Sequence, residues 1–394
     1  MLSAAHDILE SKENSTDAID TNSTNTNTSY HLVCNPISTG AILLADILPT
    51  VIIKLTAPFY MQKIPYNIRV RLVCLFAAGS FIIVALSKNL GLSLFGVVCA
   101  SLSSGFGEIT FLSMTSFYNK KVVSTWSSGT GMAGLAGALS YVGLLSAGLT
   151  PKNTLLLMLV VPAIFLLTYE LLLYKLHNVS RYRAESSLIL PTEENAAENS
   201  PFLFDDDIDN DIRQERKSHE NIVSLFCTNA RLIKGLILPY MLPLAIVYFA
   251  EYFINQALFE LLQFHSKLTF SEQYRWYQAL YQAGVFISRS SVNLIRIRYL
   301  WLMPVLQTVN LVLLLCQTFF HFIPSVWIVM ILIAYEGLLG GAAYVNTFYS
   351  MTEEVPEENL EFCLGVATVS DSLGITIAGF VSLPVHNAIC SRLR

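Results

Sequence analysis

The chain has 394 residues, of which 53% are apolar and 13% are charged. Soluble domains hold about 25% charged residues, so this composition excludes an ordinary soluble domain and indicates a protein that crosses the membrane several times. The net charge is −5, and the seven cysteines form no C-x-x-C pair, which argues against a zinc site or a disulfide framework.

Apolar stretches of about 20 residues, the length that crosses the hydrocarbon core, recur along the chain with short polar breaks. Stretches about half as long would instead have indicated a β-barrel. We therefore expect an all-α polytopic membrane protein with about ten helical spans. They are placed at 37–61, 70–87, 90–118, 123–149, 153–175, 235–263, 272–290, 299–320, 325–350 and 362–384.

Residues 1–36 precede the first of these spans and are rich in Ser, Thr and Asn. Asn14, Asn22 and Asn27 each begin an N-x-Ser/Thr sequon. Sequons in a polar segment predict a glycosylated loop on the lumenal side of the membrane.

Basic residues that follow the spans give an independent orientation. Lys63, Arg69 and Arg71 come after the span 37–61, and positive charge concentrates in cytosolic loops. This places the sequon-bearing loop in the lumen, in agreement with the sequons. Alternation of the spans then assigns further bases to the cytosolic side: Lys120, Lys121, Lys175, Arg181, Arg183, Arg289, Arg296 and Arg298.

The segment 176–230 differs in composition from the spans on either side. Within it, residues 185–220 contain eleven acids and three bases, a local charge of −8, and few apolar residues. Such a segment cannot bury a core, so we expect a disordered acidic cytosolic linker. It separates an N-terminal transmembrane bundle, 37–175, from a C-terminal bundle, 231–394. Trafficking proteins are the partners expected at this linker, where Glu185–Leu190 resembles an acidic dileucine signal.

A polar face runs along the span 235–263. Tyr248, Glu251, Tyr252, Asn255 and Phe259 recur at the spacing of one side of a helix. In lipid that face must point into the protein. Two interpretations remain open: a carboxylate bonded to a neighbouring helix for structural reasons, or the wall of a cavity with a substrate or proton site.

Three further acids lie inside predicted spans. Glu108 follows Ser101 and Ser104, Glu336 stands in the apolar run 331–350, and Asp371 lies in the span 362–384. An ionisable group at membrane depth costs at least about 2.5 kcal/mol on insertion scales, so it normally faces a wet cavity or a partner. All three are candidates for substrate or proton binding.

Asp46 and Lys54 share the span 37–61, but they are about 12 Å apart along the helix axis and cannot pair directly. We expect Lys54 to extend toward the cytosolic headgroups, which leaves Asp46 as the better candidate for a cavity group. By the same argument Arg289 is expected to anchor the interface rather than bind an anion.

Small residues form two stripes on the span 123–149. Gly129, Ala133 and Gly137 make one small-xxx-small stripe, which predicts a helix-packing face. Thr130, Gly134 and Ala138 make a second stripe beside it.

The sequence contains no nucleophile–base pairing, HExxH helix, P-loop or Gly-rich dinucleotide turn. We therefore expect no enzymatic activity, no metal, no cofactor and no nucleic-acid partner. The expected partners are the lipid bilayer, small polar metabolites and protons.

Four segments together resemble the battenin family, whose name comes from the lysosomal protein of juvenile neuronal ceroid lipofuscinosis. They are Trp126-Ser-Ser-Gly-Thr-Gly131, Glu251-Tyr-Phe-Ile-Asn-Gln256, Tyr274-Arg-Trp-Tyr277 and Tyr335-Glu-Gly-Leu-Leu-Gly-Gly-Ala-Ala-Tyr-Val-Asn346. The resemblance runs through nearly the whole chain except the sequon-rich loop and the linker. It adds Asn346 to the candidate site residues.

The resemblance implies a major-facilitator-like bundle of two helical halves in late endosomal and lysosomal membranes. It also implies export of glycerophosphodiesters from phospholipid breakdown, and support of lysosomal pH homeostasis. The residues alone favour a proton or a zwitterionic or cationic headgroup, because an anion would need a basic partner.

Both ends of the sequence depart from the family pattern. Met1–Leu9 resembles the lumenal end of the family's first helix, so we expect one further span to precede it in the family's architecture. Counting that span puts Glu108 on helix four and Glu336 on helix ten, equivalent positions of a repeat with a shared central role. Cys390 is followed by four residues where a prenylation signal needs three, so lipidation is not expected.

Two functions are weighed. The first is an exporter in which Glu108, Glu251 and Glu336 line a central cavity and the two halves rock about it. The alternative is a non-transporting lysosomal membrane scaffold that recruits trafficking partners through its cytosolic linker.

Overall fold

The computed structural model describes residues 39–61, 64–87, 90–172, 230–259, 261–264, 266 and 268–393. All regular secondary structure in these ranges is helical, which confirms the predicted all-α class. The three sequons and residues 176–229 of the predicted linker lie outside the described residues.

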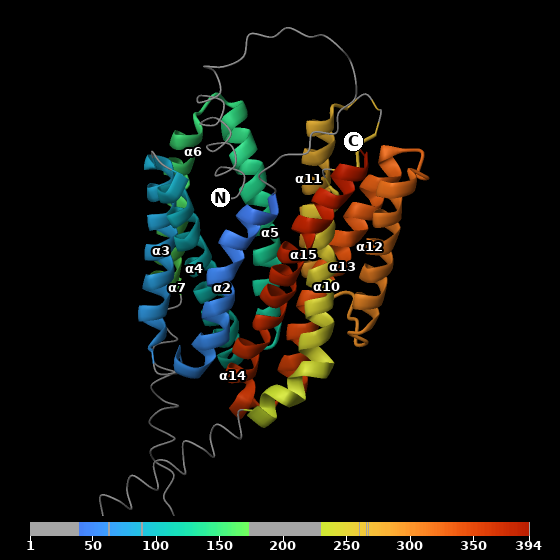
Figure 1. Cartoon of the computed structure of the whole chain (residues 1–394). Helices are drawn as coiled ribbons and strands as arrows, with labels where there is room; N and C mark the ends of the chain where they lie inside the picture. Colours follow the sequence, from blue (N-terminus) through green and yellow to red (C-terminus); the bar gives the residue numbers. More distant parts are fainter. Residues whose placement is uncertain are drawn as a thin grey trace, which may run out of the picture. The chain divides into compact units, whose positions relative to one another are not determined.

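The N-terminal bundle consists of the helices before the linker (Figure 1). They are α2 (Thr39–Tyr60), α3 (Tyr66–Leu86), α4 (Leu90–Met114) with a 3₁₀ turn at Thr115–Phe117, α5 (Lys121–Ser146), α6 (Pro151–Leu157) and α7 (Val160–Leu172). The break between α6 and α7 divides the predicted span 153–175.

The C-terminal bundle follows the linker. It comprises the π-helical turn Ile237–Met241, α10 (Leu242–Phe253), a second π-helical turn at Ile254–Leu258, α11 (Phe270–Ser290), α12 (Leu302–Phe320), α13 (Val326–Glu354), α14 (Glu357–Ala367) and α15 (Val369–Leu393). Every one of the predicted spans in both bundles overlaps a helix.

Seven helical segments of the described residues are long and apolar enough to cross a membrane. They are Tyr66–Leu86, Gly91–Phe117, Pro151–Leu171, Ala230–Leu258, Leu302–Phe320, Val326–Glu354 and Glu357–Ile389. The long helices α2, α5 and α11 are not among them. This supports a polytopic membrane protein, whereas the number of ten spans stays a prediction.

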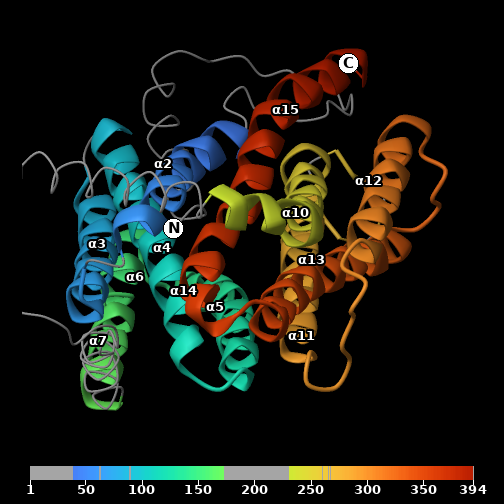
Figure 2. The same cartoon turned by 90° about the horizontal axis from the view of Figure 1, so that it is seen from below.

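The chain divides into two compact units, one of residues 1–162 with 236–394 and the other of residues 163–235. Helices of both predicted bundles contribute to the first unit. Within it α4 packs against α2 and α3, α10 packs against α12, α13 and α15, and α11 packs against α13. The two bundles meet where α2 contacts α15 and α5 contacts α11, as Figure 2 shows from below.

Local sequence signals explain where several helices begin. Thr269 and Glu272 form a capping box at the start of α11, in which each side chain accepts from the other residue's backbone N–H. Ser325 caps α13 by accepting from the N–H of Trp327, and Thr150 caps α6 by accepting from that of Asn153. These caps fix where α6, α11 and α13 begin, and the last two carry residues of the site.

Candidate functional site

Lys54 lies in a buried ion cluster that joins the two bundles. Its Nζ is 2.6 Å from Glu108 Oε2 and 2.9 Å from Asp371 Oδ1. Lys54 and Glu108 come from α2 and α4, whereas Asp371 comes from α15. Only 1% of the lysine is exposed, so the prediction that it reaches the headgroups is wrong. Carboxylates from two other helices neutralise the ammonium inside the protein, which removes the need to reach water.

Asp371 is held by the local fold of its own helix. α14 ends at Ala367 and α15 begins at Val369, so this carboxylate lies in the first turn of a helix. Its Oδ1 accepts from the backbone N–H of Ser372 and, at 3.0 Å, from the Ser372 hydroxyl. Free N–H groups and the helix dipole favour negative charge at this position. The helix break therefore prepares a buried carboxylate for Lys54.

Arg289 extends the same site along α11. Its guanidinium donates to Thr130 Oγ1 at 2.7 Å and to the Tyr248 hydroxyl at 2.8 Å. It also lies 4.1 Å from the centroid of the Tyr344 ring, whose hydroxyl donates to Glu108 Oε1 at 2.8 Å. The prediction that Arg289 anchors the interface is wrong, because hydrogen bonds and a cation–π contact hold it inside the protein.

We call Lys54, Glu108, Asp371, Arg289 and Tyr344 the inter-bundle cluster. It contains two cations and two carboxylates, so its fixed charges balance. An anion that enters must therefore compete with Glu108 or Asp371 for a cation. Among the residues that the structure describes, the buried Nε of Arg289 has no hydrogen-bond partner, which leaves one donor for such a ligand.

Glu251 lies on α10 inside the C-terminal bundle. Its Oε1 accepts from the Tyr281 hydroxyl of α11, and its carboxylate packs directly on Gly340 of α13. A Cβ at Gly340 would collide with that carboxylate. The glycine is therefore required for Glu251 to approach α13. This explains one of the small residues that follow Glu336 in the sequence.

Glu336 is fully buried one turn before Gly340, and Glu251 is the charged group that acts on it. Neither of its carboxylate oxygens has a hydrogen-bond partner among the described residues. Glu108, in contrast, belongs to the inter-bundle cluster. The shared central role predicted for Glu108 and Glu336 is therefore not seen, because they occupy different environments. Glu336 instead lies near Glu251 of α10, whose carboxylate packs on Gly340 one turn further along α13.

With this geometry established, comparison with known proteins decides the family. The family described as CLN3 protein matches residues 1–392. The chain belongs to the CLN3 protein family. It is 49% identical to battenin of Canis lupus familiaris, over 99% of this chain and 87% of that protein. It is 42% identical to protein BTN1 of Yarrowia lipolytica and 40% identical to protein btn1 of Aspergillus fumigatus, over 89% and 91% of this chain and 86% and 83% of those proteins.

Two predicted site residues of this CLN3 family chain lie beside the inter-bundle cluster rather than in it. Asp46 is half-buried on α2, and its backbone carbonyl accepts from Ser101 Oγ. Tyr252 is half-buried and stacks on Tyr248, with ring centroids 6.2 Å apart. Tyr252 can thus position a residue that binds Arg289.

Asn255 and Asn346 differ in what they contact. Asn255 lies on the π-helical turn after α10, and its buried Oδ1 has no partner among the described residues. Asn346 Oδ1 accepts from the backbone N–H of Ile297 at 2.8 Å, and its Nδ2 donates to the Ala342 carbonyl. Asn346 therefore fastens the segment between α11 and α12 to α13.

The packing face of α5 is not the one predicted. Gly129, Ala133 and Gly137 are exposed, and a Cβ at either glycine would meet open space. The contact with α11 uses Gly131 and Gly134, where a Cβ would collide with or crowd Phe286 and Gln282. The partner helix α11 covers Thr130, Gly131 and Gly134 instead, a face that shares two residues with the second stripe.

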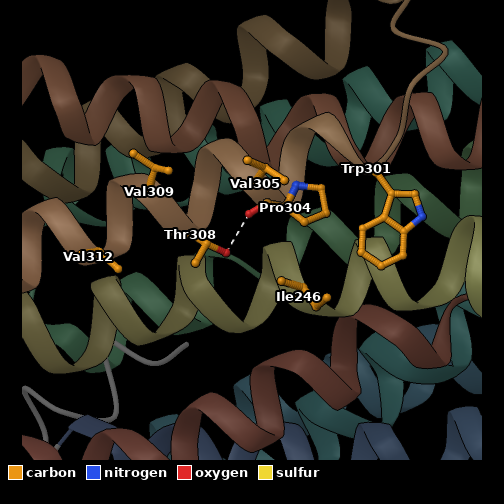
Figure 3. A pocket seen from close by; sticks show the side chains of 7 residues that line it. All are labelled: Ile246, Trp301, Pro304, Val305, Thr308, Val309 and Val312. Carbon is orange, nitrogen blue, oxygen red and sulfur yellow. Dashed lines mark hydrogen bonds between the residues drawn. The ribbon is translucent and has the colours of Figure 1, made fainter.

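An apolar groove of about 460 Å³ lies between α10 and α12 and contains none of the predicted site residues (Figure 3). Its lining is Ile246, Trp301, Pro304, Val305, Thr308, Val309 and Val312. The one hydroxyl, of Thr308, donates to the Pro304 carbonyl of its own helix at 2.7 Å. A lining made almost entirely of apolar side chains suits acyl chains rather than a polar metabolite.

The sequence reasoning missed Lys54 and Arg289 as site residues and gave no role to Tyr281, Tyr344 or Gln307. Tyr344 stands inside a quoted motif, so its spacing could have drawn attention to it. The two cations could have been found by asking what neutralises the buried acids. The sequence analysis expected the acids to face a wet cavity and the cations to reach headgroups, and it did not consider that the acids and cations pair with each other.

Proposed function

We propose that this CLN3 family protein is a transporter of late endosomal and lysosomal membranes that exports small phospholipid-breakdown metabolites, the glycerophosphodiesters. In this role it supports lysosomal catabolism and pH homeostasis. Family membership supports the proposal. The four motifs that resemble the battenin family support it as well, because that resemblance implies the same transport function. The observation that carries it is the bond from Lys54 to a carboxylate of each bundle.

A charged cluster shared by two bundles suits a substrate site at their interface. Lys54 can exchange a carboxylate for a ligand anion, so that the buried ammonium itself keeps a negatively charged partner. A phosphodiester carries one negative charge and several oxygens that accept hydrogen bonds. The basic partner that an anion requires is supplied twice, by Lys54 and by Arg289.

Exchange of partners would also couple binding to motion. While Lys54 bonds Glu108 and Asp371, it ties α2 and α4 to α15. A ligand anion that takes the ammonium from Asp371 removes this tie. The bundles can then separate at lower cost, which is what a rocking transporter requires.

The test is uptake of labelled glycerophosphodiester into vesicles that contain the purified full chain. We expect saturable uptake, and we expect Arg289→Gln to raise the half-saturating concentration by roughly tenfold to a hundredfold. Hydrogen bonds to charged groups are worth about 1.5–3 kcal/mol, and about 1.4 kcal/mol corresponds to a factor of ten. The matched control is Lys152→Met, which removes an exposed cation of the N-terminal bundle.

Two results would contradict the proposal. Absence of uptake by the folded wild-type chain would remove the transport function. Equal uptake by Arg289→Gln and Lys152→Met would remove the inter-bundle cluster as the substrate site. If deletion of 185–220 abolishes metabolite clearance in cells while Arg289→Gln leaves it intact, the scaffold function is favoured instead.

A further inference from the structure

The interior of the C-terminal bundle holds an unusual set of buried polar atoms. Among the described residues, five acid and amide side chains there have oxygen or nitrogen atoms that are buried without a hydrogen-bond partner. They are Glu251, Asn255, Gln307, Asn310 and Glu336. Buried polar atoms are almost always paired, so a concentration of exceptions within one bundle calls for a ligand or a function.

Gln307 and Glu336 lie at about the same depth. Asn310 of α12 donates to the carbonyl of Leu332 on the antiparallel helix α13, at 3.4 Å. Gln307 precedes Asn310 by three residues and Glu336 follows Leu332 by four, so both are displaced in the same direction, by about 4.5 and 6 Å. Both side chains are fully buried, and neither amide atom of Gln307 has a partner in the described part of the chain.

The charges around Glu336 offer it no counterion. α10 contributes Glu251 and Tyr252, and α11 contributes Tyr281 and Arg289. Arg289 is already bonded to Thr130 and Tyr248, and the α12 groups at this level are uncharged amides. Two ionised carboxylates in such a place would each need several kcal/mol of compensation, so the environment favours a neutral acid.

We propose that Glu336 and Glu251 form a proton-binding site in which Glu336 holds one proton and Gln307 is its amide partner. Glu336 donates the proton toward an acceptor oxygen of Gln307 or Glu251. The Gln307 amide N–H donates in return to the Glu336 carbonyl oxygen, directly or through one water. Glu251 remains the ionised member, stabilised by the Tyr281 hydroxyl and by the positive charge of Arg289.

This site is separate from the inter-bundle cluster. The residues that bind the proton all come from the C-terminal bundle. The inter-bundle cluster draws on both bundles, and its two cations, Lys54 and Arg289, balance its two carboxylates without a proton. The inference deepens the proposed function, on which it rests for its role: substrate and proton would bind to different residues, linked through Arg289. Proton binding itself can be tested without any transport.

The experiment is infrared spectroscopy of the purified full chain in lipid nanodiscs between pH 5 and pH 8. A protonated carboxyl group has a carbonyl band that an ionised carboxylate lacks. We expect this band in the wild type at pH 7, its loss in Glu336→Gln and its retention in Glu251→Gln. Glu108→Gln is the matched control, because a carboxylate paired with Lys54 contributes no such band.

Several results would contradict the assignment of the proton to Glu336. A wild type without the band at pH 7, or a band that is lost in Glu251→Gln but kept in Glu336→Gln, would overturn the assignment. If Glu336→Gln does not fold, Glu336→Asp should keep the band at a shifted position, and an unshifted band would count against Glu336. In Gln307→Leu the band should shift as its hydrogen bond is lost, and an unmoved band would remove Gln307 from the site.

Glycerophosphodiester uptake by the same wild-type preparation distinguishes this inference from the proposed function. A band without uptake would refute the transporter and leave the proton site. Uptake without a band would refute the proton site and leave the transporter.

Discussion

Among single residues, those of the inter-bundle cluster carry charges that can be buried only because each has an oppositely charged or hydrogen-bonded partner. Lys54 is 1% exposed and contacts two carboxylates, one of which also accepts from Tyr344. Burying such groups costs more than a good ion pair returns, so the cluster adds little stability compared with apolar packing. Removing one member is different, because its partners stay buried with unbalanced charge.

We therefore expect Lys54→Met to destabilise the folded chain by about 3–5 kcal/mol, the usual cost of breaking a buried ion pair from one side. Adding Asp371→Asn to it should recover part of that loss, because one of the two stranded carboxylates is then neutral. Thermal unfolding in detergent measures both effects. Lys152→Met provides the exposed-lysine control, and an equal unfolding temperature for Lys54→Met and Lys152→Met would show that the cluster is not formed.

Single residues also show how far the site could be predicted from the sequence. The buried acids were identified because a carboxylate in an apolar run is conspicuous by itself. The role of Lys54 could not be identified in this way, because Asp371 lies 317 residues away and no local pattern joins them. A lone lysine in a span has the same local sequence context whether it extends to headgroups or binds a carboxylate.

At the scale of elements, the close crossing of α11 and α13 depends on glycine. A Cβ on Gly337 would collide with the Tyr281 carbonyl, and one on Gly341 would collide with Ser288 and Val285. Gly284 on α11 makes the reciprocal approach to the Ala334 carbonyl. These glycines let α11, which carries Tyr281, approach α13, which carries Glu336. The crossing therefore helps to form the acid site as well as the bundle.

Gly337→Ala should therefore destabilise the protein by about 1–3 kcal/mol, as overpacking of a tight interface does. Gly129→Ala is the matched control, since a Cβ there meets open space. Alanine also favours a helix over glycine by about 1 kcal/mol, so the control should be neutral or slightly stabilising. Thermal unfolding of the two variants measures both effects. If Gly337→Ala stabilised the protein, α11 and α13 would have to lie farther apart than in this structure.

The elements themselves could largely be predicted, because length and hydropathy locate a span without knowledge of its neighbours. The break between α14 and α15 could not, nor could the π-helical turns on either side of α10. Such features depend on which backbone bonds the tertiary packing favours. The packing stripe on α5 was missed for a related reason: two stripes of small residues are equivalent until a partner helix covers one of them.

At the scale of the whole molecule, a series of polar contacts between the bundles lies on one side of the ion cluster. Tyr66 at the start of α3 donates to Glu361 on α14. Within its own bundle, Tyr66 also contacts the ring of Phe117, which lies in the 3₁₀ turn after α4. The first turn of α5 follows directly, and there Ser124 accepts from Asn293 at 3.0 Å. The bases of the sequence predict that this end faces the cytosol. We propose that these contacts close the cytosolic end of the transporter.

A transporter that rocks must break these contacts in every cycle, which gives a direct test. Cysteines at Ser124 and Asn293, joined by a short bifunctional thiol reagent with a reducible link, should reduce glycerophosphodiester flux to background. Cleaving the link should restore it. Cysteines at Ser87 and Ser93 form the control pair, because their hydroxyls are 2.6 Å apart within the N-terminal bundle and do not separate when the bundles rock. Full flux through the chain linked between Ser124 and Asn293 would show that this end does not open during transport.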